Sequence, residues 1–305
     1  MQRVALYNNL WGIHHEMYGY ILDYISQLTV KVSVRIYLLM DKPNEGWIDF
    51  YRAAFPSLGF ETHPTQSFNS SDHDIIFLLT DDDWGFTIDN ENWNKVVCID
   101  HYYQIRRPGK FFRVSTRFFE NRPDDKWVLP VYKYTSFEDK LKLTMCNITR
   151  IKVACVGVGG KFDISLVQQH VSNFHEIEFI IMTRKTVTRN KYRQFPNITF
   201  VEDAHAQQMM AIVATCHYVL CVPQNINYET QLMSGCIPIS FITGCRLIMT
   251  RRMATSYALS SPLLLDDIDT LPTPTIKDIE NVYIETTKLV NQRDTFFTEK
   301  LKSLL

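Results

Sequence analysis

The regular alternation of short apolar runs with longer amphipathic stretches constrains the fold of this chain more than any other feature of the sequence. The apolar runs are rich in β-branched residues and do not alternate strictly between apolar and polar positions. That pattern is typical of parallel strands covered on both faces. The expected strands span residues 3–7, 32–40, 74–79, 95–99, 152–156, 178–182, 198–201, 218–222, 237–241 and 262–265.

Helical patterns lie between these runs. In residues 16–28, for example, Tyr20, Ile21 and Tyr24 fall on one stripe of an expected helix. Similar spacing marks residues 164–174, 207–216 and 276–305. Strands that alternate with helices predict an α/β architecture with parallel sheets.

The alternation occurs twice along the 305 residues, with a polar, charged stretch between the two series. We therefore expect two Rossmann-like domains that face one another across a cleft, residues 1–148 and 149–275, followed by a C-terminal helix over 276–305. Ligands of open α/β sheets bind outside the carboxyl ends of the strands, so the strand-to-helix loops are where functional residues are expected.

Composition excludes several classes of protein. The 46% hydrophobic and 21% charged residues are typical of a globular protein. The 32 basic and 33 acidic side chains give a net charge of −1, which argues against nucleic acid as the main partner. The seven cysteines contain no C-x-x-C pair and lie mostly in apolar runs, as expected of reduced thiols rather than disulfides or a zinc site. Without a signal-peptide pattern or an apolar run of membrane-spanning length, the chain is expected to be soluble and cytoplasmic.

Two loops of the second series suit anion binding. Cys155-Val-Gly-Val-Gly-Gly-Lys161 follows an expected strand, so Gly159 and Gly160 would let the backbone approach a phosphate, with Lys161 beside it. Arg184 and Lys185 follow the next strand and could meet a diphosphate. The alternatives are a tight strand-to-helix turn for the first loop and a solvated charge cluster for the second.

The most specific pattern is Tyr218-Val-Leu-Cys-Val-Pro-Gln-Asn-Ile-Asn-Tyr-Glu229, followed by Thr230-Gln-Leu-Met-Ser-Gly-Cys-Ile-Pro-Ile-Ser240. It is expected to form a strand, a loop, a short helix stopped by Gly235 and another strand. This order resembles the nucleotide-sugar domain of GT-B glycosyltransferases, and Ser-Gly-Cys-Ile-Pro-Ile resembles the exostosin-type branch. The resemblance covers roughly residues 150–270.

The resemblance implies that Glu229 accepts hydrogen bonds from ribose hydroxyls, with Asn227, Tyr228 and Thr230 around it. Glu229 lies six residues before Gly235, where the family usually has five, and Cys221 stands where a second glutamate is frequent. The resemblance also implies that the C-terminal helix crosses back onto the first domain, and that transfer needs neither a metal nor a cofactor.

The first half would then bind the acceptor and supply the base. In this fold the loop after the first strand often faces the acceptor, and here it carries Asn9, Trp11 and His14. His15 and Glu16 follow as candidate bases, because imidazole titrates near neutral pH. Asp100 and His101, at the end of the expected strand 95–99, form a second candidate pair. A histidine bonded locally at a strand end is the simpler alternative.

The acidic run Asp81-Asp82-Asp83 needs separate treatment. Paired acids after an apolar strand could hold a hard divalent ion. A solvated acidic loop fits better with a nucleotide site in the second half, so we expect no metal site.

Together these patterns predict a metal-independent glycosyltransferase, a hexosyl- or pentosyltransferase that moves a sugar from a UDP- or GDP-linked donor to a hydroxyl of an oligosaccharide or glycoprotein. A sugar-nucleotide epimerase of the same fold and a binding-only, degenerate member are the alternatives. The sequence is also compatible with an origin in a large DNA virus or a microbe.

Overall fold

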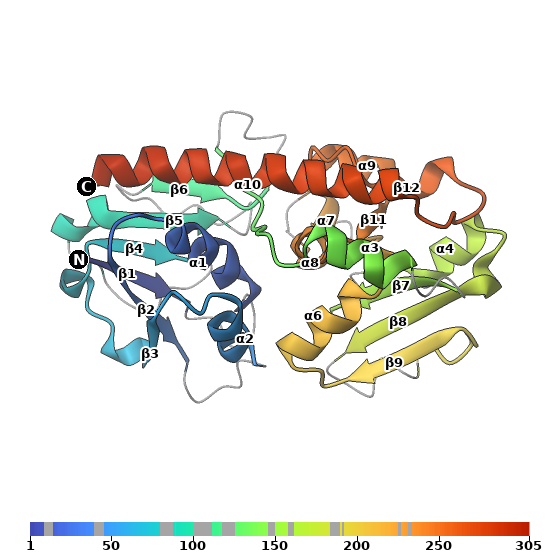
Figure 1. Ribbon diagram of the computed structural model, residues 1–305, viewed down its shortest axis with the longest axis horizontal. Coiled ribbons are helices and arrows are strands. Elements are labelled where there is room, and N and C mark those ends of the chain that lie inside the picture. Colours follow the sequence, from blue (N-terminus) through green and yellow to red (C-terminus); the bar gives the residue numbers. More distant parts are fainter. Residues whose placement is uncertain are drawn as a thin grey trace. The chain divides into compact units, whose positions relative to one another are not determined.

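The computed structural model divides the chain into two compact units (Figure 1). The first unit comprises the chain up to Pro130 and the last part of the chain from Leu289, and the second comprises Val131–Thr230 and Ser234–Lys288. The expected boundary at residue 148 lies later in the chain than this division. The structure describes residues 1–8, 15–39, 46–79, 88, 90–100, 112–117, 126–145, 150–157, 162–183, 190, 192–224, 227–230 and 234–304.

The first unit contains a six-stranded parallel sheet in the order β3-β2-β1-β4-β5-β6. Its strands are β1 (Gln2–Tyr7), β2 (Val32–Leu38), β3 (Phe60–Pro64), β4 (Ile75–Leu78), β5 (Val96–Asp100) and β6 (Phe112–Ser115). Its helical segments are η1 (His15–Tyr18), α1 (Gly19–Ser26), α2 (Trp47–Ala54), η2 (Thr65–Ser67), η3 (Ser70–Asp72) and η4 (Asn90–Lys95).

The second unit contains another six-stranded parallel sheet, in the order β12-β11-β10-β7-β8-β9. Its strands are β7 (Ile151–Val156), β8 (Ile177–Thr183), β9 (Ile198–Glu202), β10 (Tyr218–Leu220), β11 (Arg246–Met249) and β12 (Leu263–Leu264). Its helical segments are α3 (Phe137–Met145), α4 (Ile164–His170), η5 (Phe174–Glu176), α6 (Ala206–Ala214), α7 (Asn227–Thr230), α8 (Cys236–Thr243), α9 (Arg251–Ser256) and η6 (Leu265–Asp267). The last helix, α10 (Ile276–Leu304), begins here.

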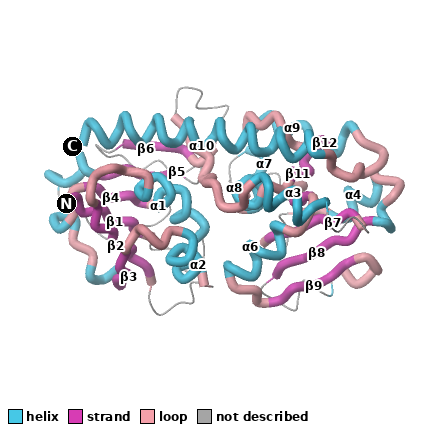
Figure 2. The backbone as a smooth tube through the Cα atoms, in the orientation of Figure 1, coloured by secondary structure: helices cyan, strands magenta, loops and turns pink. Residues whose placement is uncertain are grey.

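Both sheets have the same topology. Read from the first strand of each unit, the order is 3-2-1-4-5-6, the doubly wound arrangement expected of a Rossmann-like domain. Helices flank the strands in each unit (Figure 2). The strand order reverses between β1 and β4 in the first unit and between β7 and β10 in the second. These two switch points are where such sheets bind ligands.

One expected strand is wrong. Residues 237–241 lie in helix α8, which is buried along its whole length. A short, uniformly apolar segment carries no periodicity that separates a buried helix from a buried strand. Pro238 is compatible with the helix because it lies in the first turn, where no intrahelical N–H bond is lost.

The expected role of Gly235 as the end of a helix is also wrong. Gly235 is the N-cap of α8 rather than the end of a helix, and Gly244 ends α8 in the left-handed conformation with φ of 67°. The next strand is β11, which the sequence patterns did not reveal; β3 and β6 were missed as well. β3 and β6 lie at the edges of their sheet, and β3 is largely half-exposed, so neither is a long apolar run.

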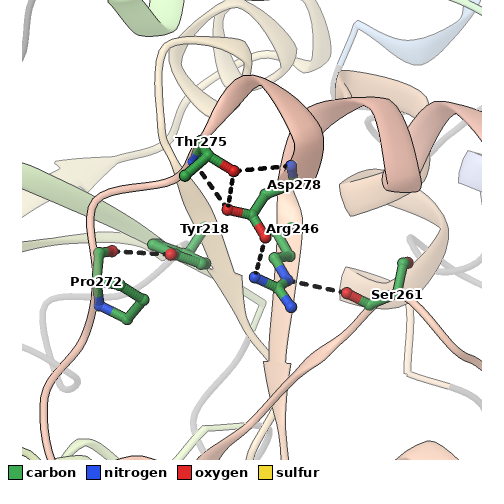
Figure 3. Close-up of polar contacts among 6 residues, drawn as sticks. All are labelled: Tyr218, Arg246, Ser261, Pro272, Thr275 and Asp278. Atoms are coloured by element: carbon green, nitrogen blue, oxygen red, sulfur yellow. Dashed lines mark hydrogen bonds and ion pairs between the residues drawn. The ribbon is translucent and has the colours of Figure 1, made fainter.

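Helix α10 starts in the second unit and ends in the first, which confirms that the C-terminal helix returns to the first domain. Figure 3 shows how its beginning is attached to the second sheet. Arg246 donates from Nη1 to Asp278 at 2.6 Å and from Nε to the carbonyl of Ser261 at 2.9 Å. Thr275 caps the helix: its hydroxyl oxygen accepts from the N–H of Asp278 at 3.2 Å, and its own N–H donates to the carboxylate of Asp278 at 2.8 Å. At the other end, Arg293 is buried in the first unit.

Candidate functional site

The switch point of the second unit brings together the carboxyl ends of β7, β10 and β11. β7 runs into Gly157, whose φ of 112° favours glycine, and Asp163 caps the following helix α4 by accepting from the N–H of Leu166 at 3.2 Å. The structure thus describes the strand before the expected loop and the helix after it. Gly159, Gly160 and Lys161, and likewise Arg184 and Lys185 after β8, lie outside the described residues.

β10 leads into α7, the short helix that carries the expected ribose-binding group Asn227 to Thr230. The side chain of Glu229 is only 15% exposed, and its Oε2 lies 3.1 Å from Nε of Arg252. The structure therefore brings together a carboxylate that the sequence predicts and an arginine that it does not.

Arg252 belongs to α9, which begins directly after β11. Thr250 caps this helix by accepting from the N–H of Met253 at 3.2 Å, and Asp266 accepts from the N–H of Arg251. The guanidinium of Arg251 forms an ion pair with Asp267. The sequence does carry a signal for Arg252, since two arginines follow the apolar run 246–249, but the patterns place the expected strand at 237–241 instead.

Tyr257, which directly follows α9, makes hydrogen bonds to the backbone of α7 and to the residue just before α8. Its buried hydroxyl donates to the carbonyl of Tyr228 at 3.3 Å and accepts from the N–H of Ser234 at 3.1 Å. Below this layer, the thiol of Cys221 lies 3.8 Å from the sulfur of Met253. The Glu229–Arg252 pair thus rests on backbone that hydrogen bonds and buried side chains hold in place.

This arrangement is suited to binding a polyhydroxylated anion. A carboxylate accepts hydrogen bonds from hydroxyl groups, and a guanidinium donates to phosphate oxygens in a planar fork. The side chain of Arg252 is 63% exposed, so a ligand can reach its outer nitrogens.

The first unit places Asp100 at the carboxyl end of β5, fully buried and 2.5 Å from Nη1 of Arg113. Its carbonyl accepts from the N–H of Thr116 at 3.0 Å. The ion pair fixes the carboxylate at the end of β5, and this geometry favours a positioning role. Its neighbour His101 lies outside the described residues.

The other candidates of the first unit are only partly visible. His15 and Glu16 begin η1, at the entry to α1, and the structure describes their backbone alone. Asn9, Trp11 and His14 lie outside the described residues. Asn8 is buried at the end of β1, and burial raises the pKa of the Tyr18 hydroxyl.

In the described part of the chain, no three His, Cys, Asp or Glu side chains are grouped so that they could hold a metal ion. Asp81, Asp82 and Asp83 fall outside that part, so the expected absence of a metal site stays a prediction. Among the described helices, none is both long enough and apolar enough to cross a membrane.

Comparisons with known proteins identify the fold. No protein-family model matches the chain, and no curated protein matches it. AviGT4, a glycosyltransferase involved in avilamycin A biosynthesis, is 10% identical with a TM-score of 0.57, over 100% of this chain and 98% of its own. HepE of Anabaena in complex with UDP-glucose is 10% identical with a TM-score of 0.60, over 99% and 100%. HepE with UDP and glucose gives a TM-score of 0.59. The chain therefore has the GT-B fold of these proteins.

Proposed function

We propose that this chain is a glycosyltransferase that moves a hexose or pentose from a nucleoside-diphosphate sugar to a glycan hydroxyl. The observation that carries the proposal is the Glu229–Arg252 pair at the carboxyl edge of the second sheet, beside the switch point between β7 and β10. HepE, which shares the fold, has been crystallised with UDP-glucose, and this favours a UDP-linked donor over a GDP-linked one.

The second unit would hold the donor. Glu229 would accept from the ribose hydroxyls, with Asn227, Tyr228 and Thr230 around the ribose. The diphosphate would meet the residues on the loops after β7 and β8, which are Gly159, Gly160, Lys161, Arg184 and Lys185. Cationic side chains and backbone N–H groups would stabilise the departing diphosphate, so that the transfer needs neither a metal nor a cofactor.

The first unit would bind the acceptor, an oligosaccharide or a glycoprotein, through Asn9, Trp11 and His14. His15, Glu16 and His101 are the candidates for the base that removes the proton of the acceptor hydroxyl. Asp100 would support that site from the end of β5 through its ion pair with Arg113.

The test is a thermal-shift series with UDP-, GDP-, ADP- and CMP-sugars in the presence of EDTA. A ligand at about 100 times its Kd adds about 2.7 kcal/mol to the free energy of unfolding, so one nucleotide class should raise the Tm clearly. Glu229→Gln should lose that rise. Glu176→Gln, which changes an exposed carboxylate at the amino end of β8, is the matched control and should keep it.

Product analysis then separates the alternatives. Sugar transfer that requires an added acceptor supports the proposal, whereas a changed sugar nucleotide without an acceptor indicates an epimerase. Tight binding with no release of the sugar indicates a binding-only protein. If no nucleotide sugar shifts the Tm, the donor site is wrongly assigned and the proposal fails.

A further inference from the structure

The ion pair at the candidate site uses only part of the guanidinium of Arg252. Its Nε contacts Glu229 at 3.1 Å, and within the described residues neither Nη1 nor Nη2 has a polar partner. The side chain is 63% exposed, at the edge of the sheet where the loops after β10 and β11 meet. Nη1 and Nη2 of the guanidinium are therefore accessible to a ligand, while Nε is held by Glu229.

The carboxylate that holds Arg252 is largely enclosed. Glu229 is 15% exposed, whereas Glu61, which pairs with Arg35 at the surface, is 72% exposed. Exposed ion pairs contribute little because both side chains are mobile and solvated. A fixed carboxylate limits the rotamers of the arginine and orients its fork.

The backbone beneath the pair is also fixed. The Thr250 cap and the bond from Arg251 N–H to Asp266 hold the first turn of α9. Tyr257, in turn, ties that helix to the carbonyl of Tyr228, next to Glu229. A guanidinium positioned in this way binds a phosphate group in two parallel N–H···O bonds at a small entropic cost.

We propose that Arg252 binds a phosphate group of the nucleotide through Nη1 and Nη2, while Glu229 holds its Nε. The inference rests on the proposed function and adds a phosphate-binding residue that the sequence patterns do not reveal. A carboxylate can accept from a guanidinium and from a hydroxyl at the same time, because its two oxygens offer about four lone-pair sites. Glu229 would then connect the ribose to the phosphate-binding arginine.

The chain provides a matched control in the neighbouring arginine. Arg251 lies on the same turn of α9 and is 62% exposed, but its guanidinium is paired with Asp267. Replacing either arginine by glutamine removes the same charge from the same surface. Only Arg252 has its fork directed by Glu229, so a difference between the two variants measures a specific contact rather than general attraction of an anion.

The experiment compares UDP with uridine on the intact chain, by calorimetry for UDP and ligand-observed NMR for uridine. Arg252→Gln should weaken UDP binding about 10- to 100-fold, the range for hydrogen bonds to charged groups, and leave uridine within about twofold. Arg251→Gln should leave both within about threefold. Arg252→Lys, which keeps the charge but not the fork, should recover only part of the loss. Glu229→Gln should weaken both ligands.

Three outcomes would overturn the inference. Unchanged UDP affinity in Arg252→Gln, with wild-type binding intact, removes the phosphate contact but leaves the proposed function standing. An equal loss for UDP and uridine shows that Arg252 acts only on the nucleoside part of the site. A wild-type chain that binds no nucleoside diphosphate at all, whether of uracil, guanine or adenine, overturns the proposed function and this inference together. The Tm of each variant excludes unfolding as the cause of a loss.

Discussion

At the scale of single residues, buried polar side chains tie the two sheets to their surroundings, and their chemistry predicts how stability depends on pH. His217 accepts the N–H of Lys152 on Nδ1 at 2.9 Å, and burial, with the nearby charge of Lys140, lowers its pKa from 6.5 to about 4. His73, bonded to the hydroxyl of Tyr37 at 3.0 Å, has a pKa lowered to about 4 by burial and by Arg35.

Because each folded-state pKa lies below the unfolded value, the unfolded chain binds more protons between pH 6.5 and 4. The stability from neutral histidine is complete above pH 6.5 and is lost as the pH falls toward 4. His217→Asn keeps an acceptor near the Nδ1 position without a titratable ring. We therefore expect its free energy of unfolding to fall less than that of the wild type over this pH range, by at most about 3 kcal/mol. Urea unfolding at a series of pH values measures it, and an unaltered slope would contradict the assignment.

Lys140 gives a second prediction at this scale. Its buried Nζ donates to the carbonyls of Ala214 and Cys216 and lies 3.1 Å from the sulfur of Cys245. Lys140→Met keeps the length of the side chain but leaves two carbonyls at the end of α6 without this donor. We expect a loss of about 2–4 kcal/mol in the free energy of unfolding. Lys142→Met, on the same helix with a side chain 77% exposed, should cost less than about 0.5 kcal/mol. Equal effects of the two variants would show that the contacts of Lys140 are unimportant.

At the scale of elements, the sequence predicts most of the parallel strands because β-branched runs of this length have few alternatives. The order of the strands follows from the doubly wound pattern, yet α8 and β11 were misassigned. Residues 236–243 are buried on every face, and a Gly-Cys pair occurs twice, as Gly235-Cys236 before helix α8 and as Gly244-Cys245 before strand β11. Local sequence does not distinguish these two pairs; packing does. The sequence does not single out Arg252 for the same reason, because the expected strand 237–241 begins nine residues before β11.

The second of those glycines supports a prediction about α8. Gly244 has a φ of 67°, and a Cβ at this position would lie 2.6 Å from the hydroxyl of Tyr283. That hydroxyl donates to the carbonyls of Thr135 and Ser136, so it cannot move without breaking those bonds. Gly244→Ala should therefore cost about 2–4 kcal/mol, from backbone strain and steric overlap together.

Gly59→Ala is the control for that substitution, since no atom beyond its two chain neighbours lies within 4 Å of the added Cβ and its φ is not positive. It should be neutral or slightly stabilising. Denaturant unfolding of the two variants measures the difference, and a Gly244→Ala protein as stable as the wild type would mean that α8 ends in another way.

At the scale of the whole molecule, two sheets of the same topology have different environments at the carboxyl ends of their strands. In the second unit the strand ends carry the Glu229–Arg252 pair near the surface. In the first unit β5 ends in the buried Asp100–Arg113 pair. The repeated architecture could be predicted from the repeated pattern of strands and helices. The sequence does not predict which strand end presents a charge at the surface, because that depends on side-chain burial.

Helix α10 belongs to both units, and each of its halves is anchored by one arginine. In the first unit, Arg293 is fully buried, with Nη2 at 2.7 Å from Asp23 and Nη1 donating to the carbonyl of Tyr20 at 2.9 Å. In the second, Arg246 joins Asp278 and Ser261. Removing one partner of a buried ion pair leaves the other charge uncompensated and costs about 3–5 kcal/mol.

We therefore expect Arg293→Met to increase amide hydrogen exchange in residues 289–304 and in α1, with little change in residues 276–288. Arg246→Met should do the reverse, loosening residues 276–288 and the loop at Ser261 while residues 289–304 keep their protection. Hydrogen exchange with peptide resolution separates the two patterns, because local opening reports the stability of each segment. If either substitution loosens the helix evenly along its length, α10 opens as a single unit and the two arginines do not anchor it independently.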